Sequence, residues 1–203
     1  MLLALVSCAA TLAAPVSDRP AFSPSAFLVR PRSLEVEIGS LWQDGASVPA
    51  RFKYGVGRVF EPRIGLDLSG VDDGRPDLTL QGKFKLLLEG EHALAFLAES
   101  AFPVADDERW SGLLAFLYTA ALPSLDLRAT AGLDLSAPTA NGVAYTGVPL
   151  TLLVGMPFTS SLSGFAEGGT VIDEGFRDWR AQGGLLWQLT GIPVVDAAGG
   201  WDF

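Results

Sequence analysis

Residues 125–135 alternate strictly between two kinds of side chain. Leucine or alanine occupies every odd position from Leu125 to Leu135. The even positions between them hold Asp126, Arg128, Thr130, Gly132 and Asp134. A repeat of two residues puts the two sets on opposite faces of a β-strand. The pattern returns about ten times, in segments of roughly the length that crosses a membrane, and this is typical of a transmembrane β-barrel with an apolar outside and a polar inside.

Length and composition also favour a fold built from β-strands. The chain has 203 residues, enough for one sizeable domain, and 49% of them are hydrophobic. Its 23 glycines and 13 prolines favour short strands and turns. Beyond the N-terminus no run of about 18 apolar residues occurs, which argues against a transmembrane helix. The net charge of −9 argues against a nucleic-acid partner.

The N-terminus reads as an export signal. Residues 1–14 are short, apolar and rich in small side chains, and Thr11-Leu12-Ala13 offers a cleavage site, although no Lys or Arg precedes them. Leu5-Val-Ser-Cys8 also fits a bacterial lipoprotein signal, so lipidation of Cys8 stays open. We expect a signal peptide at 1–14, an N-terminal periplasmic segment or extra strand at 15–33, and a β-barrel at 34–203.

The alternation predicts about eleven strands. They are expected at 34–42, 48–56, 64–69, 78–88, 93–102, 110–121, 125–135, 143–154, 162–171, 179–189 and 194–203. Bacterial single-chain barrels have even strand numbers, so the fold class is an up-and-down antiparallel barrel of about twelve strands. Residues 22–30 would supply the missing strand, or one strand is missed elsewhere, or the closing strand is lacking. The face assignment of 110–121 stays open.

The predicted connections are of two kinds. Those such as Pro123-Ser124 are short, whereas the others, such as 71–77 and 103–109, are longer and acidic. Outer-membrane barrels combine short periplasmic turns with longer external loops, so we expect the acidic loops to face the outside.

Ionisable residues within the strands are predicted to line the interior, because Arg or Lys facing lipid near the midplane costs about 2–4 kcal/mol. The predicted lining residues are Glu35, Glu37, Arg51, Lys53, Asp67, Lys83, Lys85, Glu99, Asp126, Arg128, Asp134, Glu167, Arg180 and Asp196. A first hairpin that turns about Gly45 would set Glu37 opposite Lys53. The set either lines a path for a small solute or forms an internal salt-bridge network that only holds the barrel.

Three motifs carry a family resemblance. Asp18-Arg-Pro-Ala-Phe-Ser-Pro-Ser25 is followed by Val29, Pro31, Glu37 and Gly39 at characteristic spacings. The others are Asp77-Leu-Thr-Leu-Gln-Gly-Lys-Phe-Lys-Leu86, and Trp187-Gln-Leu-Thr190 with Val195-Asp-Ala-Ala-Gly199. Together they resemble a bacterial outer-membrane family of transporters associated with the meta-pathway of phenol degradation. The resemblance implies an outer-membrane channel for aromatic or other hydrophobic compounds. Members of that family usually continue for one more hairpin arm after the last motif.

The expected function is therefore a channel or transporter for small solutes in the outer membrane of a Gram-negative bacterium. Its expected partners are outer-membrane lipids and the solute, with no cofactor, metal or nucleic acid. A structural or ligand-binding barrel without transport, and a soluble exported β-barrel carrier, are the alternatives. An enzyme is not expected, because Ser–His catalysis needs a histidine near its serine, and His92 falls in a predicted surface turn.

Overall fold

The fold is that of a computed structural model of the 203-residue chain. The structure describes residues 23–38, 41–42, 46–69, 76–103, 111–136, 146–172, 177–188 and 194–202. Within these ranges no helix is long and apolar enough to cross a bilayer. The predicted signal peptide at 1–14, with Cys8, lies outside the described residues, as does most of each predicted acidic loop.

The described chain is built from β-strands joined in sequence order. The strands are β1 (Leu34–Ile38), β2 (Leu41–Trp42), β3 (Ala46–Tyr54), β4 (Phe60–Ser69), β5 (Pro76–Glu89), β6 (His92–Pro103), β7 (Ser111–Leu122), β8 (Leu125–Ser136), β9 (Thr146–Pro157), β10 (Leu162–Ile172), β11 (Arg177–Gln188) and β12 (Val194–Asp202).

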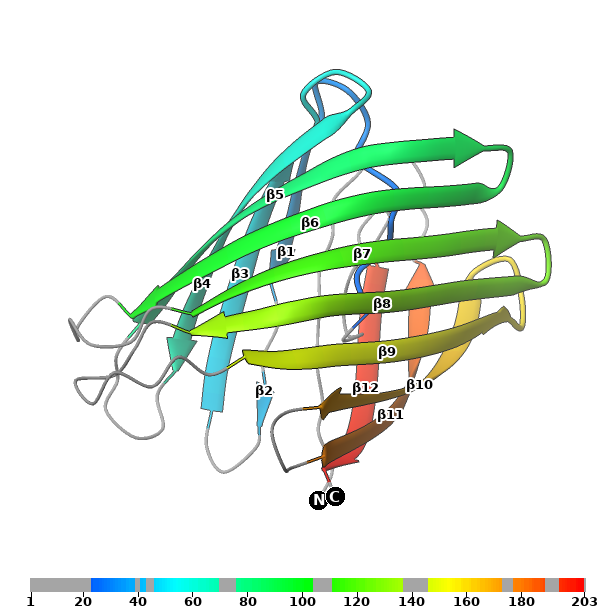
Figure 1. Cartoon of the computed structure of the whole chain (residues 1–203). Helices are drawn as coiled ribbons and strands as arrows, with labels where there is room; N and C mark the ends of the chain where they lie inside the picture. Colours follow the sequence, from blue (N-terminus) through cyan, green and yellow to red (C-terminus); the bar gives the residue numbers. More distant parts are fainter. Residues whose placement is uncertain are drawn as a thin grey trace.

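The strands form one antiparallel sheet in the order β1, β3, and then β4 to β12, and each pairs with the next strand in that order. β2 also pairs with β3, in the same register as β1, so β1 and β2 lie along one line. The predicted all-β, antiparallel, up-and-down arrangement is thus confirmed. β1 and β12 end this path, and no pairing joins them in the described part of the chain. Figure 1 shows the sheet curling round a central space.

The two faces of the sheet have opposite chemistry. On one face large apolar side chains are exposed, among them Phe52, Phe116 and Trp187 at 44%, 56% and 55%. On the other face, Glu37 and Lys83 are 0–1% exposed. We call these the outer and inner faces. Period-two alternation produces this division because successive side chains of a strand point to opposite sides.

Short turns close one end of the sheet. Gly57 and Gly90 have positive φ, at 64° and 57°, in the turns after β3 and β5, where the absence of a Cβ makes this conformation accessible. The register of β5 and β6 shifts between Lys85 and Leu87. Such a bulge lets adjacent residues point to the same side, and Leu86, Leu87 and Leu88 are all exposed.

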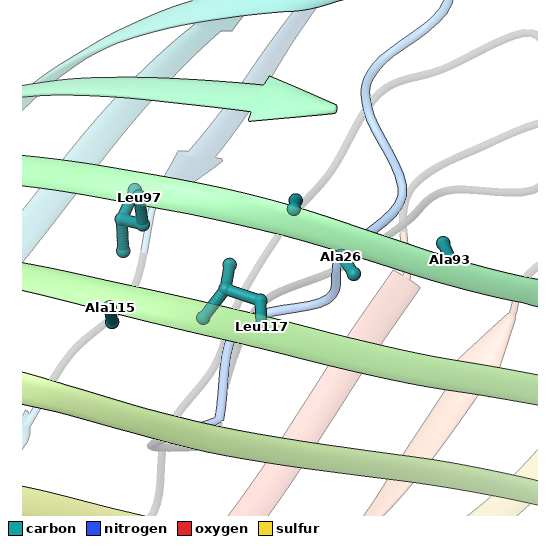
Figure 2. Close-up of a cluster of buried hydrophobic side chains, with 6 residues drawn as sticks. Ala26, Ala93, Leu97, Ala115 and Leu117 are labelled. Carbon is teal, nitrogen blue, oxygen red and sulfur yellow. The ribbon is translucent and has the colours of Figure 1, made fainter. Parts of the chain in front are cut away.

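Residues 23–30, which we call the inner segment, form no strand and lie against the inner face. Ala26 is fully buried in a cluster that includes Leu97 of β6 and Leu117 of β7. Figure 2 shows Ala26 on the N-terminal trace beside these two strands. The predicted extra strand at 22–30 is therefore absent over the described residues 23–30, which occupy the space that the sheet surrounds.

Two local expectations are wrong. Glu37 pairs with Arg51 rather than Lys53, because the first hairpin is centred one residue earlier than Gly45. The strand predicted at 64–69 begins earlier than expected, because β4 already begins at Phe60. Pro62 obscured the strand, because proline lacks the N–H that a sheet ladder uses.

Gly55 marks the point where the inner segment leaves the interior and enters β1. The Arg32 N–H donates to the Gly55 carbonyl at 2.8 Å, and the Gly55 N–H donates to the Ser33 carbonyl at 3.0 Å. A Cβ added at Gly55 would lie only 2.0 Å from the Arg30 carbonyl oxygen. The crossing therefore requires glycine.

We expect Gly55→Ala to lower the free energy of unfolding by roughly 1–3 kcal/mol, the usual cost of overpacking. Gly168→Ala is the control, because the nearest atom to its added Cβ, the Arg180 carbonyl oxygen, is 3.9 Å away. Urea unfolding in detergent measures both. Equal stability of the two variants would contradict the close crossing.

Candidate functional site

All of the predicted lining residues occupy one face of the sheet. The strand pairings from β1 to β12 keep these residues on the same face of the sheet. Glu35 lies beside Lys53 and Lys53 beside Arg63, and at the other end Arg180 of β11 and Asp196 of β12 lie on that same face. Asp67 and Asp196 are placed on this face by the strand register alone, since the structure describes only the backbone at these two positions. The candidate site is therefore the whole inner face rather than one loop.

Lys53 anchors the first group of charges. Its Nζ lies 2.9 Å from Glu35 Oε1 and 2.7 Å from Glu37 Oε1. All three side chains are at most 2% exposed. Lys53 thus reaches Glu37, although that residue pairs with Arg51 along the backbone. A long side chain on the correct face can reach a diagonal neighbour. This group combines two carboxylates with one ammonium.

Glu61 is the centre of the second group. Its Oε1 lies 2.5 Å from Arg63 Nε and 3.4 Å from Lys83 Nζ. All three side chains are buried, on the neighbouring strands β4 and β5. This group combines one carboxylate with two cations.

The inner face also binds the backbone of the inner segment. Lys83 Nζ donates to the carbonyls of Ser25 and Phe27, at 2.9 and 2.6 Å. The N–H of Val29 donates to Glu61 Oε2 at 2.5 Å, and the N–H of Ala26 donates to Thr119 Oγ1 at 2.8 Å. In an ordinary strand, the backbone N–H and C=O groups are hydrogen-bonded to the backbone of a neighbouring strand. In the inner segment, charged and hydroxyl side chains take the place of that neighbouring backbone.

The inner segment continues across to β9, where the Ser23 and Thr151 hydroxyls are hydrogen-bonded. Its contacts thus run from β4 and β5 through β7 to β9. Part of the internal charge network, around Glu61, therefore binds a segment of this chain.

The remaining predicted residues are spread along the inner face. Gln81 Nε2 donates to Glu99 Oε2 at 2.5 Å, and Gln182 Nε2 donates to Glu167 Oε2 at 2.6 Å. Arg51, Lys85 and Asp134 are partly buried, whereas Arg180 is exposed.

A cavity of about 270 Å³ opens at the end of the inner face near the turns after β7 and β9. Asp126 and Arg128 supply its charges, with Arg128 Nη2 2.7 Å from Asp126 Oδ2. Its apolar lining includes Leu153, Phe165 and Leu186. Leu153 is adjacent on the inner face of β9 to Thr151, so the cavity begins beside the Ser23 end of the inner segment.

Sequence reasoning missed two parts of the site. Glu61 and Arg63 alternate with Phe60, Pro62 and Ile64, but the turn signals around them hid this pattern. The face assignment of β7 stayed open because both of its faces are apolar: Leu117 and Phe116 point to opposite sides. The inner face is apolar there because it packs on Ala26.

His92, predicted to lie in a surface turn, is instead the first residue of β6, directly after the turn. Its Nδ1 is 2.7 Å from the Tyr118 hydroxyl, and the pair is exposed. In the described ranges, no three His, Cys, Asp or Glu side chains are grouped so that they could hold a metal ion.

Comparisons of the chain with known protein families, with characterised proteins and with solved structures give no match.

Lys53→Met should lower the free energy of unfolding by about 3–5 kcal/mol, because it removes the ammonium that lies within hydrogen-bonding distance of two buried carboxylates. Adding Glu35→Gln and Glu37→Gln should restore most of the loss, since the two carboxylates that Lys53 compensates are then neutral. Denaturant titration of the single and triple variants is the measurement. A single variant as stable as the parent would show that Lys53 is not needed to compensate the two carboxylates.

Proposed function

We propose that this chain is an outer-membrane β-barrel that passes small solutes, including aromatic or other hydrophobic compounds. The observation that carries the proposal is the inverted burial of the sheet. Charges such as Glu35, Lys53 and Arg63 are buried on the inner face, while large apolar side chains are exposed on the outer face.

Water-soluble proteins rarely expose apolar patches beyond a few hundred Å². Here exposed leucine, phenylalanine, valine or tryptophan side chains occur on nearly every strand from β1 to β11. Lipid tails are a suitable neighbour for such a surface, whereas water is not. This favours a membrane barrel over a soluble exported carrier.

Strand length is consistent with crossing a bilayer. A tilted transmembrane strand needs about 9–11 residues. β3 and β12 have 9 residues, β4 has 10, and β5 to β11 have 11–14. Because hydrocarbon cannot hydrate an open sheet edge, we infer that the edges that β1 and β12 leave are covered in the membrane.

The cavity near β8 and β9 supports a solute role. An apolar cavity of about 150 Å³ can bind benzene, and this one is larger and mainly apolar, with one ion pair in its lining. A substituted aromatic ring would fit its size. The three sequence motifs that resemble the phenol-degradation transporters point to the same kind of solute.

The inner segment favours a second candidate, a structural barrel without transport. A sheet whose interior is occupied and whose buried ions bind its own backbone could serve only to hold its shape in the membrane. Both candidates predict the same outer surface, so only a measurement of permeation separates them.

Reconstitution in planar bilayers provides that test. We expect the full chain to migrate differently on gels before and after heating, as folded barrels do, and to give discrete current steps. A folded, heat-modifiable protein that never conducts would favour the structural barrel. A protein that remains monodisperse in buffer without detergent would overturn both membrane proposals.

Phe116→Arg should destabilise the protein in lipid vesicles by about 2–4 kcal/mol, the cost of arginine on a lipid face. Phe116→Gln controls for the lost ring contact with Phe96, whose centroid is 5.6 Å away. Ser124→Arg adds the same charge in an exposed turn and should be neutral. Equal stability of the arginine and glutamine variants at position 116 would argue that this face meets water.

A further inference from the structure

We propose that the inner segment is a displaceable plug, latched by Lys83 and Glu61, whose movement opens the interior of the barrel. The inference rests on the proposed channel function for its role in permeation. The movement itself can be measured independently.

Side chains of the wall, rather than a backbone ladder, hold the inner segment. Residues 23–29 belong to no strand, and the bonds described above reach the wall through side chains of Glu61, Lys83, Thr119 and Thr151. The strands around them are joined along their length by backbone ladders. Elements with few backbone bonds to the rest of the structure open at lower free energy than the ladders do.

Only a small apolar surface of the segment is fully buried. Ala26 and Val29 are buried, whereas Phe27 and Leu28 are only partly buried. Because burial stabilises in proportion to apolar area, the two partly exposed side chains contribute less than full burial would. The segment therefore depends on its polar contacts with the wall as well as on this apolar surface.

The charges that hold the inner segment remain compensated after its release. Lys83 Nζ is 3.4 Å from Glu61 Oε1, and Arg63 Nε is 2.5 Å from the same oxygen. Without the segment these charges still compensate one another, and water can hydrate the freed backbone. Release therefore leaves no isolated buried charge, which would otherwise oppose it strongly.

The segment also has an anchor from which to move. Arg32 has a positive φ of 63°, and its N–H is bonded to Gly55. Residues 31–33 thus stay attached to the end of β3 while residues 23–30 can leave the wall. Their departure would connect the cavity beside Leu153 with the rest of the inner face.

Thiol accessibility tests the movement directly. In a Cys8→Ala background, Ser25→Cys places a single thiol at a position that is 1% exposed. We expect slow labelling by a water-soluble maleimide, and labelling about tenfold faster or more when Lys83→Met removes two charge-assisted bonds. Lys85→Met removes the same charge on the same face and should leave the labelling rate unchanged.

A second variant covers the case in which Lys83→Met fails to fold. Thr119→Val deletes the acceptor of the Ala26 N–H and should also speed labelling, whereas Thr79→Val, on the inner face of β5, should not. Labelling that is equally slow in all folded variants would overturn the latch. So would fast labelling in the unmodified background.

A disulfide then connects movement with permeation. Because the Ser23 and Thr151 hydroxyls are in contact, Ser23→Cys with Thr151→Cys should form a bond that locks the plug in the Cys8→Ala background. We expect conductance to fall about tenfold or more on oxidation and to return on reduction. Equal conductance in both states, with the disulfide shown to have formed, would overturn the plug. Absence of conductance in every form, with labelling still accelerated by Lys83→Met, would overturn the channel function and leave the displaceable segment intact.

Discussion

The structure depends on the compensation of charges that the sheet removes from water. A buried ion is tolerated only with an opposite charge and hydrogen bonds close by. Lys53 meets this condition for Glu35 and Glu37, and Glu61 meets it for Arg63 and Lys83. These contacts join neighbouring strands on the inner face, so they also favour the pairing in which every strand presents the same face inward. A slip by one residue would expose the apolar face to the ions and leave them unpaired.

Most of the sheet could be predicted from the sequence, because alternation fixes both the strand and the face of each residue. The fourteen predicted ionisable residues share one face for this reason. The exact ion-pair partners could not be predicted, since the Lys53 side chain is long enough to reach both its directly paired neighbour Glu35 and its diagonal neighbour Glu37. Glu61 was not predicted to face the interior, because the adjacent Pro62 is typical of a turn rather than of a strand. The faces of β7 could not be told apart, because alternation fails where the inner face packs against another part of the same chain.

The inner segment could not be found from sequence pattern for a different reason. Its residues follow no helical or strand period, and its backbone is satisfied by side chains from β4, β5 and β7 that lie 32–93 positions away in sequence. Local signals contain nothing about such partners. Once the segment is in place, it explains the apolar surface at Ala93, Leu97 and Leu117, which is unusual for a polar interior. The ions and this small apolar surface together form its seat.

The two groups of buried ions have opposite net signs: Glu35, Glu37 and Lys53 carry one negative charge in sum, and Glu61, Arg63 and Lys83 carry one positive charge. Their fields therefore oppose one another at a distance and add only in the space between them. A permeant molecule would meet a local dipole instead of a uniformly charged wall. The six charges sum to zero, so in the proposed channel this part of the inner face would favour neither anions nor cations, and discrimination there would depend on the size and shape of the solute.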